Sequence, residues 1–232
     1  SNSIWPFTRY SRMKYTIAVL GGHSALDVCA GAKKHGFKTL AVCQKGREKT
    51  YAEYYKTRDG LGCIDEVILV DKFSDITKSE VQKELKKRNV IFIHNRYFWV
   101  YCDFDKIEKD FDVPIFGTRH MVRLEERDVE KNQYWLLEQA GIRIPKMISA
   151  PSKIDRPVIV KVNEATRSYE RAFFVAVSPN DYEEKSSAMI KKGQITKAGL
   201  EKAVIEELII GAQVNFNFFY SPLSNRLDLM GT

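Results

Sequence analysis

The chain has 232 residues, 44% of them hydrophobic and 29% charged, a composition typical of a soluble globular protein with one large domain or two smaller ones. No hydrophobic run reaches the roughly 18–20 residues of a membrane span, and the N-terminus lacks the hydrophobic stretch of a secretory signal. The net charge is +7, but Lys and Arg are interspersed with acids. We therefore expect no membrane or nucleic-acid partner. Scattered basic residues are more consistent with a ligand that is a phosphorylated small molecule.

Cysteine and histidine are both sparse in this chain. The cysteines are Cys29, Cys43, Cys63 and Cys102, and the histidines are His23, His35, His94 and His120. The cysteines lie in or near hydrophobic stretches without CxxC spacing, so we interpret them as reduced core thiols of a cytoplasmic protein. The histidines have no metal-binding spacing, and no Ser–His–Asp, HExxH or Walker motif is present. The sequence does not favour a zinc enzyme.

The first half of the chain alternates short hydrophobic runs with helical segments. We expect strands at Tyr15–Leu20, Lys38–Cys43, Glu66–Val70, Val90–His94 and Pro114–Phe116, and helices at Ser24–His35, Tyr51–Lys56 and Lys78–Lys87. Ser24 should cap the first helix and Gly36 should end it. This alternation predicts an α/β fold with an open, mostly parallel sheet whose ligands bind at the carboxyl ends of its strands. We place this domain at residues 14–120, after an N-terminal arm at 1–13.

The second half changes to longer strands and predicts an α+β unit with an antiparallel sheet. We expect helices at Glu126–Ala140 and about Asn180–Lys192, with strands at Val158–Val162, Arg171–Ala176 and from Val204 onward. Residues 121–145 would form a connecting helix and linker, 146–212 one lobe, and 213–232 the beginning of another. A complete two-sheet pocket needs more strands than remain before Thr232. We therefore expect that the gene product continues or that the chain is not a complete catalyst.

Glycines and basic residues follow the first two predicted strands. Gly21, Gly22, His23 and Ser24 end the first, and Lys45 and Arg47 follow the second. Glycines at such a position let backbone N–H groups approach a phosphate, whereas a dinucleotide site needs GxGxxG and an acid after the second strand. A nucleoside monophosphate or sugar phosphate therefore fits better than NAD. The alternatives are a tight glycine turn beside a solvated basic loop, and a structural role for His23.

A loop rich in aromatic residues follows the fourth strand at the same edge. In Asn95–Trp99, an arginine, Arg96, stands beside three aromatics that include Tyr97. Arginine and aromatic rings together can stack a base and fix an anion. Alternatively, the aromatics pack against the second domain.

Charged residues interrupt two hydrophobic strands of the second unit. Lys161 lies within Val158–Val162, where an unpaired ammonium is costly, so it needs either a phosphate or a glutamate such as Glu206 or Glu207. These two acids form either an ordinary edge pair or a segment that offers backbone groups to adenine and carboxylate to ribose or metal. Lys131, early in the preceding helix, is a weaker candidate for the same anion. A strand lysine and a paired acid suit an ATP pocket between two sheets, as in the ATP-grasp fold.

The order of motifs carries a more specific resemblance. The segments are VLGGHSALDVCAGAKKHGF, the QKGR loop, PIFGTR, LLEQAGIRIPK, PVIVKV and IEELIIGAQVNFNFFYSPL. Together they resemble the archaeal PurP family of 5-formaminoimidazole-4-carboxamide ribonucleotide synthetases. The resemblance covers the chain from about residue 14 to its end. It implies a Rossmann-like pre-ATP-grasp domain followed by an ATP-grasp domain that is incomplete here.

The resemblance also implies a reaction and a set of ligands. ATP, Mg²⁺, formate and aminoimidazole carboxamide ribonucleotide would react through formyl phosphate in purine synthesis, in an enzyme that self-associates into a homo-oligomer. By motif match, His23 falls on the family's ribonucleotide-binding histidine and Lys161 on its phosphate-binding lysine. The adenine–ribose hinge falls on Glu206, Glu207, Leu208 and Ile209.

Three departures from the family pattern indicate a divergent paralogue. Tyr97 stands where family members carry a serine that touches the ribonucleotide. The segment Asn163–Arg171 replaces a glycine-rich phosphate loop, so side chains such as Arg167 would have to replace backbone contacts. The carboxylates that bind magnesium would lie beyond Thr232. The alternatives are an ATP-grasp ligase for another carboxylate and amine, and a non-catalytic nucleotide-binding subunit.

Overall fold

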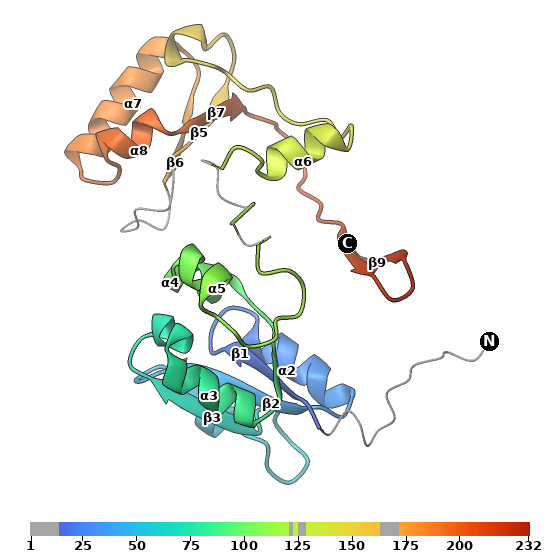
Figure 1. Cartoon of the computed structure of the whole chain (residues 1–232). Coiled ribbons are helices and arrows are strands. Elements are labelled where there is room, and N and C mark those ends of the chain that lie inside the picture. Colours follow the sequence, from blue (N-terminus) through green and yellow to red (C-terminus); the bar gives the residue numbers. More distant parts are fainter. Residues whose placement is uncertain (1–13, 121–122, 125–128, 163–171) are drawn as a thin grey trace. The chain divides into compact units, whose positions relative to one another are not determined.

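The computed structural model describes residues 14–120, 123–124, 129–162 and 172–232. The chain divides into two compact units at the boundary between residues 125 and 126, and each is described by itself (Figure 1). The predicted arm at 1–13 lies outside the described residues, and the predicted domain boundaries stay predictions. No helix among the described residues is long and apolar enough to cross a membrane.

The first unit contains the predicted parallel sheet. Its strands are β1 (Thr16–Leu20), β2 (Lys38–Gln44), β3 (Glu66–Val70) and β4 (Val90–Phe92). They are all parallel, in the order β3-β2-β1-β4. A fifth strand at Pro114–Phe116 was expected, but only a single bridge forms there, between Ile115 and Phe92. The α/β prediction is confirmed for this unit, with four strands in place of five.

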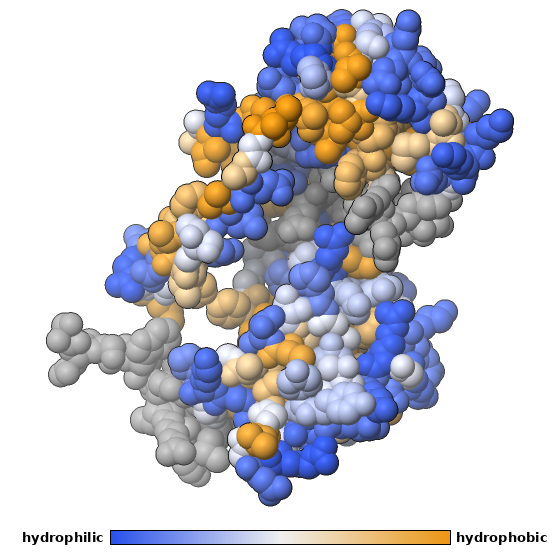
Figure 2. All heavy atoms as spheres, turned by 180° about the vertical axis from the view of Figure 1, so that it is seen from behind, coloured by the Kyte–Doolittle hydropathy of each residue, from blue (hydrophilic) through white to orange (hydrophobic). Residues whose placement is uncertain are grey.

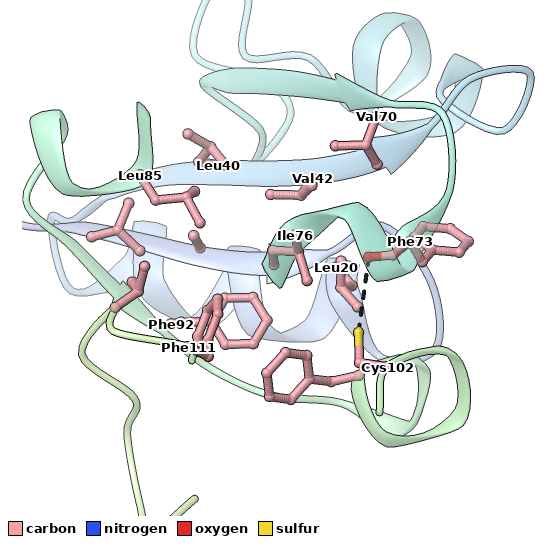
Figure 3. Packing of buried hydrophobic residues seen from close by; sticks show 14 of the residues in the cluster. Leu20, Leu40, Val42, Val70, Phe73, Ile76, Leu85, Phe92, Cys102 and Phe111 are labelled. Atoms are coloured by element: carbon pink, nitrogen blue, oxygen red, sulfur yellow. Dashed lines mark hydrogen bonds between the residues drawn. The ribbon is translucent and has the colours of Figure 1, made fainter. Parts of the chain in front are cut away.

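Helices cover both faces of this sheet. The elements are α2 (Ala25–Lys34), the π-helix η1 (Thr50–Tyr54), the 3-10 helix η2 (Phe73–Thr77), α3 (Ser79–Lys87), α4 (Arg96–Tyr101) and α5 (Phe104–Lys109). Side chains alternate along a strand, so Leu20 and Val42 pack with Phe73 on one face, whereas Val19 packs with Cys29 of α2 on the other. Figure 3 shows the first of these clusters, in which Phe92 and Phe111 lie edge to face, 5.4 Å apart. Burial on both faces explains why these strands are continuously hydrophobic.

Two predictions about helix starts in this unit are corrected. Ser24 precedes α2 but does not cap it: its φ is +62°, no side-chain cap bond forms, and its Oγ instead lies 3.0 Å from His23 Nδ1. Asn95–Trp99 is not a loop but the first turn of α4. The buried Asn95 caps that helix by accepting from the Tyr97 amide, while its Nδ2 donates to the Leu20 carbonyl at 2.9 Å. This one side chain ties the end of β1 to the start of α4.

The second unit contains the predicted antiparallel sheet. Its strands β5 (Val158–Lys161), β6 (Phe173–Ala176) and β7 (Val204–Glu207) have the order β6-β5-β7. The other elements are α6 (Gln133–Gln139), the 3-10 helix η4 (Pro151–Lys153), α7 (Pro179–Lys191) and α8 (Lys197–Glu201). Val158, Val160 and Val162 face a core completed by Tyr182 of α7. The expected helix at Glu126–Ala140 is shorter, because Asn132 caps it and α6 begins at Gln133.

The chain ends in a hairpin whose surface is largely hydrophobic. β8 (Asn217–Ser221) pairs with β9 (Arg226–Gly231). The preceding stretch and the hairpin expose large side chains: Ile209, Ile210, Val214, Phe216, Phe218, Tyr220, Leu227, Leu229 and Met230. Figure 2 shows hydrophobic side chains on the molecular surface, including this C-terminal stretch. The strand expected from Val204 onward is therefore interrupted: β7 ends at Glu207 and β8 begins at Asn217, and no core covers β8 within the described residues.

All four cysteines are buried, as the sequence predicted. Burial is the main cause that raises the pKa of Cys29, Cys43 and Cys102 to about 12, so these thiols stay protonated and react slowly at neutral pH. We predict that a disulfide reagent added at pH 8 labels the folded chain at least about 100-fold more slowly than the chain in guanidinium.

The control for this experiment is Ser224→Cys, which places a thiol on an exposed turn. Its added thiol should react at the rate of the unfolded chain. A native cysteine that reacts as fast as this added thiol would contradict the buried-core assignment.

Candidate functional site

Lys161 lies at the end of the central strand of the second sheet. Because side chains alternate, Val158 and Val160 face the core, whereas Ile159 and Lys161 face the opposite side of the sheet. Glu206 on β7 is directly opposite Ile159 and therefore diagonal to Lys161 on that same side. The strand register thus brings the lysine and the acid together.

Lys161 and Glu206 form an ion pair that a tyrosine completes. Glu206 is only 4% exposed, and its Oε1 is the partner of the Lys161 ammonium. The Tyr134 hydroxyl donates to Glu206 Oε2 at 2.6 Å and accepts from Lys161 Nζ at 3.3 Å. Burial, and then the neighbouring Glu206 carboxylate, raise the pKa of Tyr134, so its hydroxyl remains a donor. A buried charge pair is retained only with such additional hydrogen bonds.

Glu207 points away from this group. Its carboxylate accepts from the Lys146 amide at 3.3 Å and lies 3.6 Å from Arg156 Nη1. Adjacent strand residues face opposite sides, so one acid of the pair joins Lys161 and the other lies at the Lys146 edge. Of the two glutamates considered as partners of Lys161, the structure selects Glu206.

The residues after Glu207 leave the sheet with hydrophobic side chains toward solvent. The Leu208 amide donates to the Pro157 carbonyl at 2.9 Å, which holds the strand end in place. Ile209 is 64% exposed and Ile210 is 87% exposed. Exposed hydrophobic residues directly beside a buried Lys–Glu pair can bind a flat aromatic base next to a phosphate group.

The sequence also predicted Lys131 and Arg167 as cations of this site. Lys131 lies in the turn before α6, not within the helix, and its ammonium is 5.4 Å from the centre of the Trp135 ring. Arg167 lies outside the described residues. Tyr134, in contrast, was not predicted from the sequence, because a tyrosine within an ordinary helical pattern gives no signal of a polar contact.

At the carboxyl edge of the first sheet, two tyrosines enclose the glycine turn. The Tyr51 hydroxyl donates to the Gly22 carbonyl at 3.4 Å. The Tyr97 ring lies so close to Gly22 that a Cβ added there would be 2.1 Å from it. Gly22 therefore serves close packing as well as the turn. His23 and Ser24 are exposed beside it and face each other. The contact of Tyr51 with Gly22 was not predicted from the sequence, although Tyr51 begins the predicted helix directly after the basic loop.

The basic loop is partly neutralised. Lys45 and Asp71 form an exposed ion pair at 2.6 Å, and Arg47 is exposed on the same turn. Arg96 is exposed in the first turn of α4. The aromatics of this turn pack within their own unit: Phe98 lies 4.9 Å from Phe92, centre to centre. The structure thus brings Gly22, His23 and Tyr97 together, while Lys45, Arg47 and Arg96 lie exposed.

Family models match segments in both halves of the chain. A family model described as "Protein of unknown function (DUF1246)" matches residues 17–148, more than half of the chain. The chain belongs to this family. A second model, "Domain of unknown function (DUF1297)", matches residues 181–232.

Curated relatives confirm the resemblance that the motifs indicated. The chain is 43% identical over 223 residues to 5-formaminoimidazole-4-carboxamide-1-(beta)-D-ribofuranosyl 5'-monophosphate synthetase of Methanothermobacter thermautotrophicus, which covers 96% of this chain and 58% of the relative. The protein of the same name from Methanococcus vannielii is 38% identical, covering 97% of this chain and 59% of the relative. The chain thus spans less than two thirds of the length of these relatives.

A solved structure confirms the fold. N5-carboxyaminoimidazole synthetase from Staphylococcus aureus, complexed with ADP, matches with a TM-score of 0.55 at 17% identity, covering 88% of this chain and 48% of that one. A parallel sheet followed by an antiparallel α+β unit is the ATP-grasp arrangement, and the fold class predicted from the sequence is confirmed.

The contact between Gly22 and Tyr97 yields a test of the first-unit site. Gly22→Ala should lower the free energy of unfolding by about 1–3 kcal/mol, because the added methyl overlaps the ring, and this loss should nearly vanish in a Tyr97→Ala background. Urea unfolding measures both.

The matched control is Gly31→Ala within α2, where nothing lies within 4 Å of the added methyl. That change should stabilise the chain by about 0.5–1 kcal/mol. If Gly22→Ala and Gly31→Ala behave alike, the ring does not lie on Gly22.

Proposed function

We propose that the second unit binds ATP through the group formed by Lys161, Glu206 and the hinge after β7. The buried Lys161–Glu206 pair is the observation that carries this proposal. A lysine whose side chain is 25% exposed can turn from its carboxylate toward a phosphate, and the carboxylate fits a nucleotide hydroxyl. Leu208 and Ile209 would contact the adenine. The relative with a known structure was solved with ADP, which supports the same class of ligand here.

The first unit would bind the second substrate, an imidazole ribonucleotide. His23 and Ser24 present polar atoms at the carboxyl edge of the parallel sheet, beside Gly22, where such folds bind ligands. Lys45, Arg47 and Arg96 would supply positive charge for its phosphate. The names of the relatives support aminoimidazole carboxamide ribonucleotide as the acceptor.

The proposed reaction of the whole protein is an ATP-dependent formylation in purine synthesis. Formate would attack the γ-phosphoryl group of ATP, giving formyl phosphate and ADP. The acceptor's 5-amino group would then attack the formyl carbon and release phosphate, forming a C–N bond. Lys161 would contribute by neutralising charge on the transferring phosphoryl group.

Magnesium would accompany ATP in such a reaction, but the residues that the structure describes do not fit a magnesium site. Among the described residues, no group of three or more His, Cys, Asp and Glu side chains could hold a metal ion. We also propose that the protein is cytoplasmic and self-associates.

A second candidate is the same chemistry with a different acceptor. The Tyr97 ring occupies the space over Gly22, where the motif match places a serine that touches the ribonucleotide. A ring there favours stacking over hydrogen bonding to the acceptor. Tyr97→Ser would raise turnover with aminoimidazole carboxamide ribonucleotide if Tyr97 were merely an obstruction to that acceptor, and would not raise it if the natural acceptor is another molecule.

The activity is tested with the longest gene product that contains this chain. We expect ADP release with Mg²⁺-ATP, formate and aminoimidazole carboxamide ribonucleotide, and none when any one is omitted. ATP binding without ADP release under all conditions would contradict the ligase assignment and leave a non-catalytic nucleotide-binding subunit.

The nucleotide site is tested on the 232-residue chain itself. Lys161→Met should weaken ADP binding by about 10- to 100-fold, the effect of losing a hydrogen bond to a charged group. Titration calorimetry measures it. Lys185→Met on α7 removes another strand-adjacent lysine, paired with Asp181, and should leave ADP affinity unchanged. An equal loss of ADP affinity in the two variants would contradict a role for Lys161 in nucleotide binding.

A further inference from the structure

The Tyr134 hydroxyl bridges both members of the Lys161–Glu206 pair. It donates to Glu206 Oε2 at 2.6 Å and accepts from Lys161 Nζ at 3.3 Å. The first contact is short, as expected for a hydrogen bond to a charged acceptor, and the second is long. Tyr134 is therefore bound more closely to the acid than to the base.

The proposed nucleotide site creates a difficulty that Tyr134 resolves. If Lys161 turns toward a phosphate, it must release Glu206, which is 4% exposed. A buried carboxylate that loses its only partner is strongly unfavourable, and that penalty would oppose nucleotide binding. Because Tyr134 uses the other carboxylate oxygen, its hydrogen bond does not depend on the ion pair.

The helix turn that carries Tyr134 is capped without using either charge. The Tyr134 backbone amide, at the start of α6, donates to the Asn132 side chain at 3.0 Å. This cap fixes the backbone of the first turn of α6 locally, while Lys161 is on β5 and Glu206 on β7. A change in the position of the Lys161 side chain leaves this local cap intact.

We propose that Tyr134 is a positioning residue that keeps Glu206 paired when Lys161 releases it. This inference rests on the proposed function in one respect, namely that a nucleotide phosphate is what draws Lys161 away. Tyr134 itself need not touch the nucleotide. It lowers the penalty of the exchange and so raises the affinity for phosphate-bearing ligands.

The first test does not need a nucleotide. Lys161→Met imitates the departure of Lys161, so Tyr134→Phe should lower the urea midpoint of unfolding more in the Lys161→Met background than in the wild-type chain. In a Glu206→Gln background, where no charge needs holding, the effect of Tyr134→Phe should shrink. This second pair keeps the test decisive if the Lys161→Met variants fail to fold. If Tyr134→Phe lowers the urea midpoint by the same amount in the wild-type chain and in the background variant that folds, the proposal is overturned.

The second test compares ADP with adenosine. Tyr134→Phe should weaken ADP binding by about tenfold, the effect of one hydrogen bond to a charged group, and leave adenosine binding unchanged, because adenosine has no phosphate to draw Lys161 away. Equal losses for both ligands, or no loss for either, would overturn the proposal.

The matched control is Tyr182→Phe on α7, which also removes a hydroxyl from a buried tyrosine of the second unit. It should change neither affinity. If the wild-type chain binds no ADP, the proposed nucleotide site fails, and the unfolding cycle still decides whether Tyr134 holds Glu206.

Discussion

A lysine in the middle strand of a sheet is the constraint on which the second unit depends. An ammonium there is tolerated only with a partner, and the strand register supplies Glu206 diagonally across from Lys161. The acid is more deeply buried than the base, so the acid has the greater need of a second partner. Tyr134 meets that need from a separate helix. The pair is thus a satisfied buried contact, which a phosphate would open in the proposed function.

In the first unit, two close contacts fix the carboxyl edge of the parallel sheet. Asn95 links the end of β1 to the start of α4 through one side chain. Gly22 lets the Tyr97 ring pack against the backbone of the turn. Both features act at the carboxyl ends of parallel strands, where ligands of such folds bind. The contact with Gly22 gives a packing role to Tyr97, which departs from the motif pattern of the resembling family.

Much of this could be read from the sequence, for identifiable reasons. Strands buried on both faces, such as Thr16–Leu20, leave a continuous hydrophobic signal. Lys161 and Glu206 were recognisable because a charge inside such a run is anomalous. Ser24 was assigned as a cap by residue type, yet its backbone takes a left-handed conformation and its hydroxyl faces His23. The preference of serine for helix caps therefore does not determine the role of Ser24 here.

Tyr134 could not be read from the sequence, because it lies 72 residues from Glu206 and 27 from Lys161. The most direct measurement is the position of Lys161 Nζ in a crystal structure of the chain with ADP. Our account predicts Nζ within hydrogen-bond distance of a phosphate oxygen, with Tyr134 still donating to Glu206. ADP bound with Lys161 still paired to Glu206 would contradict it.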